Sequence, residues 1–289
     1  MKPFLLASGA EIPRIGLGTW QLPKDKVGGL IKEALKLGYR HLDCALDYGN
    51  EKEIGDAIRE SGIKRNEIFI TSKLWNTYHR PDLVKKAITK TLADLQVDYL
   101  DLYLIHFPHP EPAEDENIEM KDFKPSYSIV DTWNAMQELV DLGLVKHIGV
   151  SNFTINRIKD VLNSNPKHLP AANQVELHPY LAQNELIDFC NQHNIHVTGY
   201  SPLGSNNNTP VLIKEKILLD VAEKYKASPA QVLLSWGIAR GTSVIPRTTN
   251  FDRLKQNIEL IELSKEDTEA INSLNQGIRF NTYYDVYDY

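Results

Sequence analysis

The chain has 289 residues, of which 42% are hydrophobic, and a formal net charge of -6 at pH 7. Its length is typical of one α/β barrel, and the lack of a basic cluster argues against a nucleic-acid partner. The N-terminal residues lack the apolar region of a signal peptide, and no apolar run approaches the ~20 residues that cross a bilayer. We therefore expect one domain over residues 1–289, in a cytoplasmic protein that is a monomer or a homodimer and has no membrane partner.

The first part of the chain is predicted to form a β-hairpin and then strands that alternate with helices. The hairpin turns at Ser8 and Gly9, between residues 4–6 and 11–14. A helix is expected to end at Gly38, and another is expected to begin at Asn50, which precedes acidic residues as N-cap residues often do. The expected strands are 14–20, 40–43, 67–73 and 99–106, and the expected helices are 27–37, 50–60 and 81–95.

The second part continues the alternation after a proline-rich, acidic loop over residues 109–126. A polar loop is expected at 205–210, and the tail 280–289 is rich in aromatic residues. The expected strands are 146–150, 172–176, 195–200 and 242–245, and the expected helices are 127–141, 154–162, 183–193, 213–226, 229–239, 251–258 and 264–274.

Eight short apolar strands that alternate with helices predict parallel βαβ units, and eight is the number of strands that closes a barrel. The predicted fold class is α/β, a (β/α)8 TIM barrel with an N-terminal β-hairpin and a C-terminal tail over the active-site mouth. The alternative is a doubly wound open sheet, which usually has fewer strands and a phosphate-binding glycine turn. Gly16 and Gly18 do not supply that turn, because the third glycine of the fingerprint is missing.

Four titratable residues lie at or just beyond the ends of three consecutive predicted strands: Asp43, Tyr48, Lys73 and His106. Taken singly, a lysine at a strand end is usually solvated and a lone histidine is usually structural. The carboxyl ends of barrel strands face one cavity, however, so four such residues together predict a catalytic site.

The chemistry that suits this set is proton donation to a carbonyl oxygen. A tyrosine has a pKa near 10, so Tyr48 needs a cation to stabilise its phenolate, and Lys73 can provide one. Asp43 can keep that ammonium charged and oriented, and His106 can donate a hydrogen bond to the substrate oxygen. None of these groups supplies a hydride, so the set implies a nicotinamide cofactor.

The sequence resembles the aldo-keto reductase family throughout its length. In that family the catalytic tetrad corresponds to Asp43, Tyr48, Lys73 and His106 of this chain. The matching blocks are residues 16–20, 43–51, 71–75, 104–106, 148–153, 173–176, 200–204 and 245–247.

The resemblance implies NADPH, with NADH as the alternative cofactor because many relatives have lysine at the position of Arg247. Ser151, Asn152 and Gln174 would hold the carboxamide, and Tyr200 would stack on the nicotinamide ring. Independently of the family, Arg247 and Arg253 beside hydroxyl groups suit a phosphomonoester, whereas the alternative is a solvated basic loop. The full set of implied cofactor contacts is Thr19, Trp20, Ser151, Asn152, Gln174, Tyr200, Ser201, Leu203, Ser205, Arg247, Thr248, Arg253, Gln256 and Asn257.

The implied activity is the reduction of small-molecule aldehydes and aldoses to alcohols, with Tyr48 as the general acid. Residues 106–108, Asp47 and residues 279–281 are similar to the yeast xylose reductases. In that group the acid and the tail asparagine are placed to bind sugar hydroxyls, and Asp47 and Asn281 would do so here. The expected substrate contacts are Trp20, Asp47, Trp75, His106, Phe107 and Asn281.

Alternatives remain for both the pocket and the function. The aromatic residues could simply pack the barrel, and Asp47 and Asn281 could be capping residues. The protein could then be a broad-specificity aldehyde and ketone reductase, or a non-catalytic NADPH-binding regulatory protein. No metal site is expected, because His106 and His109 lack a third ligand nearby.

Overall fold

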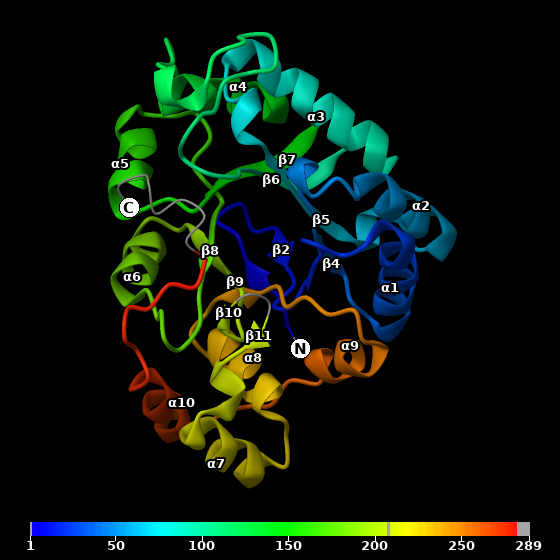
Figure 1. The fold of residues 1–289 in the computed structure, drawn as a ribbon, viewed down its shortest axis with the longest axis vertical. Coiled ribbons are helices and arrows are strands. Elements are labelled where there is room, and N and C mark those ends of the chain that lie inside the picture. The colour runs from blue at the N-terminus through cyan, green and yellow to red at the C-terminus, as the bar shows by residue number, and fades with distance from the viewer. Residues whose placement is uncertain (1, 207–208, 282–289) are drawn as a thin grey trace.

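The computed structural model describes residues 2–206 and 209–281, and its centre is an eight-stranded parallel sheet. Neighbouring strands follow the order β12-β9-β8-β7-β6-β5-β4-β3. A parallel bridge between Ile15 and Val244 joins the two ends of this order, with backbone hydrogen bonds of 2.9 Å on both sides of Val244. The predicted barrel is therefore confirmed (Figure 1). The strands are β3 (Leu17–Gly18), β4 (His41–Asp43), β5 (Phe69–Leu74), β6 (Leu100–Ile105), β7 (Val145–Ser151), β8 (Ala172–Glu176), β9 (His196–Tyr200) and β12 (Ser243–Val244).

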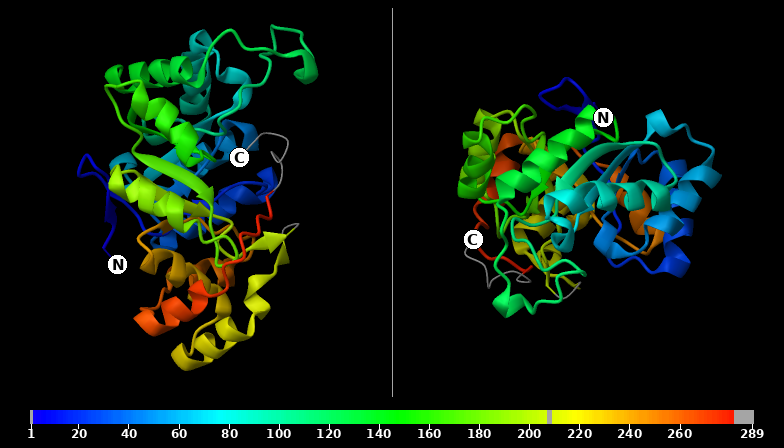
Figure 2. Two further views of the ribbon diagram at one scale, coloured as in Figure 1. Left: turned by 90° about the vertical axis from the view of Figure 1, so that its left-hand side faces the viewer. Right: turned by 90° about the horizontal axis from the view of Figure 1, so that it is seen from above.

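Helices connect the strands and surround the barrel (Figures 1 and 2). Helix α1 begins at Lys24, three residues before the predicted start, and ends at Gly38, whose φ of 101° only glycine adopts easily. The α-helices are α1 (Lys24–Leu37), α2 (Glu51–Ser61), α3 (Pro81–Leu95), α4 (Ile129–Asp141), α5 (Ile155–Asn163), α6 (Asn184–Gln192), α7 (Lys216–Tyr225), α8 (Pro229–Ala239), α9 (Phe251–Ile258) and α10 (Lys265–Asn272).

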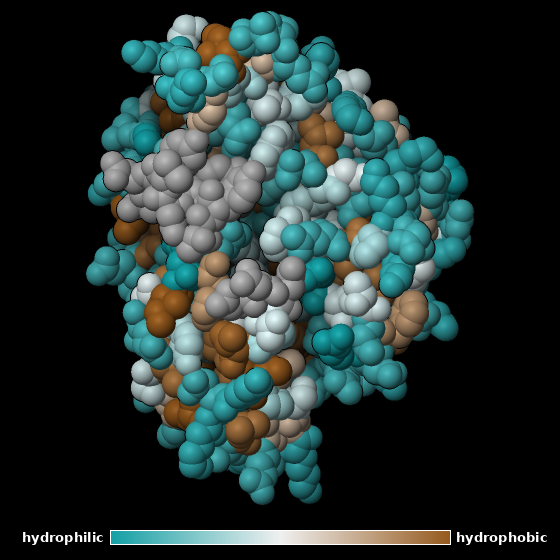
Figure 3. All heavy atoms as spheres, viewed as in Figure 1, coloured by the Kyte–Doolittle hydropathy of each residue, from teal (hydrophilic) through white to brown (hydrophobic). Residues whose placement is uncertain are grey.

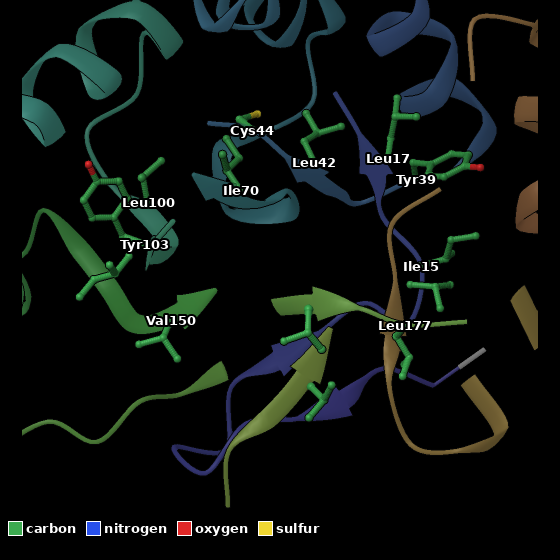
Figure 4. Packing of buried hydrophobic residues seen from close by; sticks show 14 of the residues in the cluster. Ile15, Leu17, Tyr39, Leu42, Cys44, Ile70, Leu100, Tyr103, Val150 and Leu177 are labelled. Atoms are coloured by element: carbon green, nitrogen blue, oxygen red, sulfur yellow. The ribbon is translucent and has the colours of Figure 1, made fainter. Parts of the chain in front are cut away.

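The core has two parts because the strands alternate between the inside and the outside of the barrel. The larger part lies between strands and helices, as Figure 4 illustrates with residues such as Leu42, Ile70 and Tyr103. The smaller part joins the N-terminal hairpin to the barrel interior. Its buried members are Leu6, Ile12, Phe69, Leu102, Leu104 and Ala172.

The N-terminal hairpin was predicted, and the structure confirms it as β1 (Phe4–Leu5) paired antiparallel with β2 (Glu11–Ile12). A second hairpin lies where the sequence predicts a polar loop. It consists of β10 (Ser205–Asn206) and β11 (Thr209–Pro210), and follows β9 directly. The acidic loop contains a short 3-10 helix, η4 (Met120–Asp122).

The face shown in Figure 3 is mostly hydrophilic. In the part of the chain that the structure describes, we find no helix with the length and apolar character needed to cross a membrane. The predicted tail aromatics Tyr283, Tyr284, Tyr287 and Tyr289 lie outside the described residues.

Candidate active site

The alternation of side chains explains why polar groups gather at one end of the barrel. Phe69 of β5 and Leu104 of β6 belong to the interior core near the hairpin. Lys73 and His106 follow them at even spacing, so their side chains point to the same interior. The barrel interior is thus apolar at the end next to the N-terminal hairpin and polar at the carboxyl ends of the strands.

Lys73 is the centre of the polar layer. Its Nζ donates hydrogen bonds to Asp43 Oδ2 at 2.8 Å, to the Cys44 carbonyl at 2.8 Å and to Tyr48 Oη at 3.2 Å. The Lys73 side chain is fully buried, and that of Asp43 is 3% exposed. Burial alone would lower the pKa of Lys73, but Asp43 and Tyr48 raise it above its usual value. The ammonium group is therefore charged, with all three of its donors used.

Asp43 has a second partner on the opposite side of the barrel. Gln174 of β8 donates from Nε2 to Asp43 Oδ1 at 2.6 Å, and Thr19 donates to the Asp43 carbonyl at 2.8 Å. Sequence reasoning missed the bond to Gln174, since the two residues are 131 positions apart. The carboxylate is held on both oxygens, which fixes its orientation toward Lys73.

Tyr48 ends the short 3-10 helix η1 (Leu46–Tyr48), which stops at Gly49 with a φ of 66°. Burial raises the pKa of Tyr48 to about 12, and the nearby charge of Lys73 acts in the opposite direction. Lys73 thus lowers the pKa of the phenol, as the sequence predicts, but desolvation is the larger effect. The Tyr48 hydroxyl keeps its proton at neutral pH and can donate it.

His106 follows β6 and lies among aromatic rings. Its ring stacks on Phe107 with centroids 4.9 Å apart, and it meets Trp75 and Tyr48 edge-on at 5.3 and 5.7 Å. Burial, with a smaller effect from Lys73, lowers the pKa of His106 well below its usual value. The imidazole is thus neutral at neutral pH, with one N–H that can donate a hydrogen bond.

Besides Thr19 and Gln174, which bind Asp43, three more of the predicted cofactor contacts are connected to the tetrad through His106. Asn152 donates from Nδ2 to the His106 carbonyl at 2.9 Å and to Ser151 Oγ at 3.2 Å. Tyr200 donates from its hydroxyl to Asn152 Oδ1 at 2.8 Å. The amide, hydroxyl and phenol groups beside His106 are of the kind that binds a carboxamide and an aromatic ring.

Apart from Trp20, which follows β3, the remaining predicted cofactor contacts lie on the segments that follow β9 and β12. Ser201, with a φ of 49°, begins a turn that leads through Leu203 to Ser205. In the second segment Thr248 and Asn257 are buried, whereas Arg253 and Gln256 of α9 are exposed. Arg247 is partly buried, and burial lowers the pKa of its guanidinium group.

The predicted substrate residues differ in exposure. Trp20 is 44% exposed and Phe107 is 8% exposed. The Asp47 side chain is exposed on η1. Partial desolvation of its carboxyl group, with the nearby charge of Glu111, raises the pKa of that group. The backbone N–H of Asn281 donates to Glu176 Oε2 at 2.9 Å. The hydrogen bond to Glu176 thus places Asn281 at the end of β8, and η1 places Asp47 beside Tyr48.

One sequence-based prediction at this site needs a correction. Asn50 occupies the N-cap position of α2, but its side chain does not cap the helix. Its Nδ2 instead donates to the carbonyls of Thr19 and Leu22 at 3.0 and 3.2 Å. The side chain is buried and connects the segment after β3 to the start of α2.

Sequence reasoning also missed Glu51 and Glu176, two buried carboxylates close to the site. Glu51 shares a helical face with the buried Ile54 and Ile58, and this spacing was the available signal. Among the described residues, no group of three or more His, Cys, Asp or Glu side chains is arranged to hold a metal ion.

Comparison with known proteins identifies the family. The aldo/keto reductase family matches residues 14–276. The chain is 46% identical over 293 residues to aldo-keto reductase family 1 member A1 of Bos taurus, a match that covers 96% of this chain and 90% of the relative. The chain belongs to the aldo/keto reductase family.

This aldo/keto reductase is similar to other members in sequence and in structure. It is 45% identical to aldo-keto reductase family 1 member A1 of Homo sapiens, over 96% of this chain and 90% of that one. The solved aldose reductase of Schistosoma japonicum superposes with a TM-score of 0.88 at 40% identity, covering 96% of this chain and 94% of the other. The protein is accordingly an NAD(P)H-dependent oxidoreductase that reduces carbonyl groups.

Proposed function

We propose that this aldo/keto reductase uses NADPH to reduce aldehydes, including aldoses of the xylose type, to alcohols. The observation that carries the proposal is the position of Lys73 Nζ, 2.8 Å from the Asp43 carboxylate and 3.2 Å from the Tyr48 hydroxyl. The neutral His106 ring meets the Tyr48 ring edge-on at 5.7 Å. This arrangement suits proton delivery to a carbonyl oxygen.

Tyr48 is the general acid in this proposal. Because its pKa is raised to about 12, the hydroxyl is protonated at neutral pH and gives its proton to the carbonyl oxygen. Lys73 then stabilises the phenolate, and Asp43 keeps the ammonium group in place. His106 donates a hydrogen bond that orients the carbonyl group. When bound, the nicotinamide cofactor supplies the hydride.

The residues around the tetrad fit a nicotinamide cofactor. Ser151, Asn152 and Gln174 offer a hydroxyl and two amides for the carboxamide, and the Tyr200 ring offers a stacking surface. Asn152 is bound to the His106 carbonyl, so the proposed cofactor and substrate sites share a hydrogen-bond network. Thr19 and Trp20 lie near the tetrad end of this cofactor site.

The preference for NADPH over NADH rests on two guanidinium groups. Arg247 and Arg253 pair well with a phosphomonoester, and Thr248, Gln256 and Asn257 offer further polar contacts. Ser201, Leu203 and Ser205 are assigned to the pyrophosphate. The test is the ratio of catalytic efficiencies with NADPH and NADH.

The sugar preference rests on polar groups at the rim of an aromatic site. In this proposal Asp47 and Asn281 bind substrate hydroxyls, while Trp20, Trp75 and Phe107 form the apolar wall next to His106. A site that binds hydroxyls rejects substrates that lack them, because its polar groups are left unpaired.

A second candidate function is a broad-specificity reductase without a sugar preference. The contacts of His106 with Trp75 and Phe107 favour it, because they make that side of the site apolar. The hydrogen bonds that join Lys73 to Asp43 and Tyr48 argue against a non-catalytic NADPH-binding protein.

The deciding experiment measures NADPH oxidation with D-xylose, DL-glyceraldehyde and an aromatic aldehyde, and repeats each assay with NADH. We expect xylose to have a catalytic efficiency similar to that of glyceraldehyde. Turnover of the aromatic aldehyde alone would support the broad-specificity candidate. No turnover with any of the three would contradict the proposed function.

A further inference from the structure

The last described residues of the chain cross the carboxyl ends of β8 and β9, and we call residues 276–281 the C-terminal strap. The strap follows α10 and runs beside β8 (Figures 1 and 2). The backbone N–H groups of Gln276 and Ile278 both donate to the Tyr180 carbonyl, at 3.2 and 3.0 Å. The Phe280 ring packs against His178 with ring centroids 5.1 Å apart.

Glu176, the last residue of β8, accepts hydrogen bonds from the end of this strap. Its Oε1 accepts from the Phe280 N–H at 2.7 Å and from His178 Nε2 at 2.9 Å. Its Oε2 accepts from the Asn281 N–H at 2.9 Å, and Arg279 Nη1 lies 3.9 Å away. One carboxylate thus binds two successive backbone amides of the strap.

The Glu176 side chain is fully buried, so an unpaired charge would be costly there. Burial alone would raise the pKa of Glu176, but the hydrogen bonds from His178 and the Phe280 and Asn281 amides bring it below its usual value. The group is therefore a carboxylate at neutral pH. Its hydrogen bonds are charge-assisted, which makes them stronger than those between neutral groups.

The strap is bound close to the reacting groups. Glu176 lies two residues after Gln174 on the same strand, so both side chains point to the barrel interior, where Gln174 binds Asp43. The strap also touches the segment after β9, because a Cβ at Gly204 would lie 3.3 Å from the Phe280 ring. A shift of the strap would therefore change the rim of the proposed substrate site.

We propose that Glu176 is a positioning residue for substrate discrimination: its carboxylate fixes the strap and thereby places Asn281 beside the substrate. This inference rests on the proposed function, since it gives a role to the strap in selecting hydroxylated aldehydes. Glu176 itself touches neither the substrate nor the reacting atoms in this proposal.

The test substitutes Glu176→Gln, which keeps the size of the side chain but turns an NH₂ group toward one of the two backbone donors. We expect the KM for D-xylose to rise about 10-fold, and kcat with an aromatic aldehyde to change less than about 2-fold. The amides of Phe280 and Asn281 should exchange hydrogen about 10-fold faster or more, as measured by mass spectrometry.

The matched control is Asp101→Asn, because Asp101 is a buried carboxylate that binds Arg65 and the Ile70 N–H instead of the strap. It controls for a general loss of stability. We expect it to leave both the xylose KM and the exchange of the strap amides unchanged.

A truncated chain that ends at Ile278 lacks the strap residues that Glu176 binds. It therefore shows whether Glu176→Gln changes the xylose KM through the strap or through a direct effect on the barrel. If Glu176 acts through the strap, Glu176→Gln adds no further increase in the xylose KM to the truncated protein. An equal increase in the full and truncated chains would overturn the inference, as would an unchanged KM and unchanged exchange in the full chain. A wild-type protein without carbonyl reduction would contradict the proposed function itself, and one without xylose reduction would overturn the role in discrimination.

Discussion

At the scale of single residues, burial gives the tetrad its pattern of charge. It raises the pKa of Tyr48 and lowers that of His106, so both rings are neutral at neutral pH. Lys73 remains charged because Asp43 lies 2.8 Å from it. The site thus offers a protonated acid and a neutral hydrogen-bond donor next to one ion pair, and this is the state that carbonyl reduction needs before any proton moves.

Tyr48→Phe removes the proposed proton donor and little else. We expect kcat to fall at least about 10²-fold, because general acid catalysis contributes 10²- to 10⁴-fold in enzymes. The Kd of NADPH, measured by fluorescence titration, should change little. Equal losses of turnover and of NADPH binding would contradict the role assigned to Tyr48.

The control for this substitution is Tyr103→Phe on β6. Tyr103 is fully buried, and its hydroxyl has no hydrogen-bond partner within the described ranges. The same loss of one oxygen should therefore leave kcat unchanged, with a free energy of unfolding that is equal or higher.

The tetrad could be predicted from the sequence because each member follows an apolar strand that ends at a polar residue. The residues that support the tetrad could not be predicted from the sequence. Glu51 and Glu176 have partners that are distant in sequence, such as Thr91 and Phe280. Asn50 was found at the predicted N-cap position, but tertiary contacts with Thr19 replaced the local cap.

At the scale of elements, a glycine permits α2 to approach α3 closely. A Cβ at Gly55 would lie 2.5 Å from the Asp94 carbonyl oxygen and 2.6 Å from that of Leu95. Backbone atoms cannot move aside cheaply, so the spacing of the two helices depends on this residue. Gly29 of α1, in contrast, has no atom within 4 Å of such a Cβ.

Gly55→Ala should destabilise the protein, by about 1–3 kcal/mol, because the added methyl group overpacks the contact between the helices. Gly29→Ala is the matched control, and it should stabilise the protein by about 0.5–1 kcal/mol through the better helix propensity of alanine. Urea unfolding followed by circular dichroism measures both. A stabilised Gly55→Ala variant would show that the contact is looser than described.

Glu51 connects helix α2, strand β5 and helix α3 through buried hydrogen bonds. Its carboxylate on α2 accepts hydrogen bonds from Ser72 of β5 at 2.5 Å and from Thr91 of α3 at 3.0 Å. Burial raises its pKa to about 7, although the two hydroxyl groups act in the opposite direction. The folded protein therefore holds this proton at a pH where the unfolded chain has released it.

This difference gives the stability a pH dependence with a definite sign. The folded pKa of about 7 lies above the ordinary 4.5, so the free energy of unfolding falls as pH rises between these values and is constant above them. The loss is about 3 kcal/mol at 1.36 kcal/mol per pKa unit. Glu51→Gln, which cannot ionise, should remove this slope in urea unfolding between pH 5 and 8.

The exposed Glu60 provides the control for the titration of a carboxylate. It pairs with Lys32 at the surface with a side chain that is 53% exposed, so Glu60→Gln should leave the slope as it is in the wild-type protein. The same slope in the wild-type and Glu51→Gln proteins would assign the pH dependence to another group.

At the scale of the whole molecule, eight alternations of strand and helix were enough to predict the barrel. The two strands that meet to close the barrel, β3 and β12, are shorter than the predicted strands 14–20 and 242–245, since each contains two residues. Backbone hydrogen bonds close the barrel between these two strands: the Gly16 N–H donates to the Val244 carbonyl and the Gly18 N–H donates to the Pro246 carbonyl. Such pairing depends on the curvature of the sheet, which the local pattern of apolar residues does not encode.

The proposed cofactor contacts extend from Thr19 to Asn257, almost the whole chain. If residues 1–289 form one domain, NADPH should stabilise all of it together, by about 2.7 kcal/mol at 100 times its Kd. For a protein of this size that corresponds to a rise in Tm of about 5 °C, measured by scanning calorimetry. NADH at the same concentration should shift Tm less, because it lacks the phosphate proposed to bind Arg247 and Arg253. Two unfolding transitions, of which only one rises in Tm with NADPH, would contradict the single domain. Equal rises in Tm with NADPH and NADH would contradict the role of the two arginines.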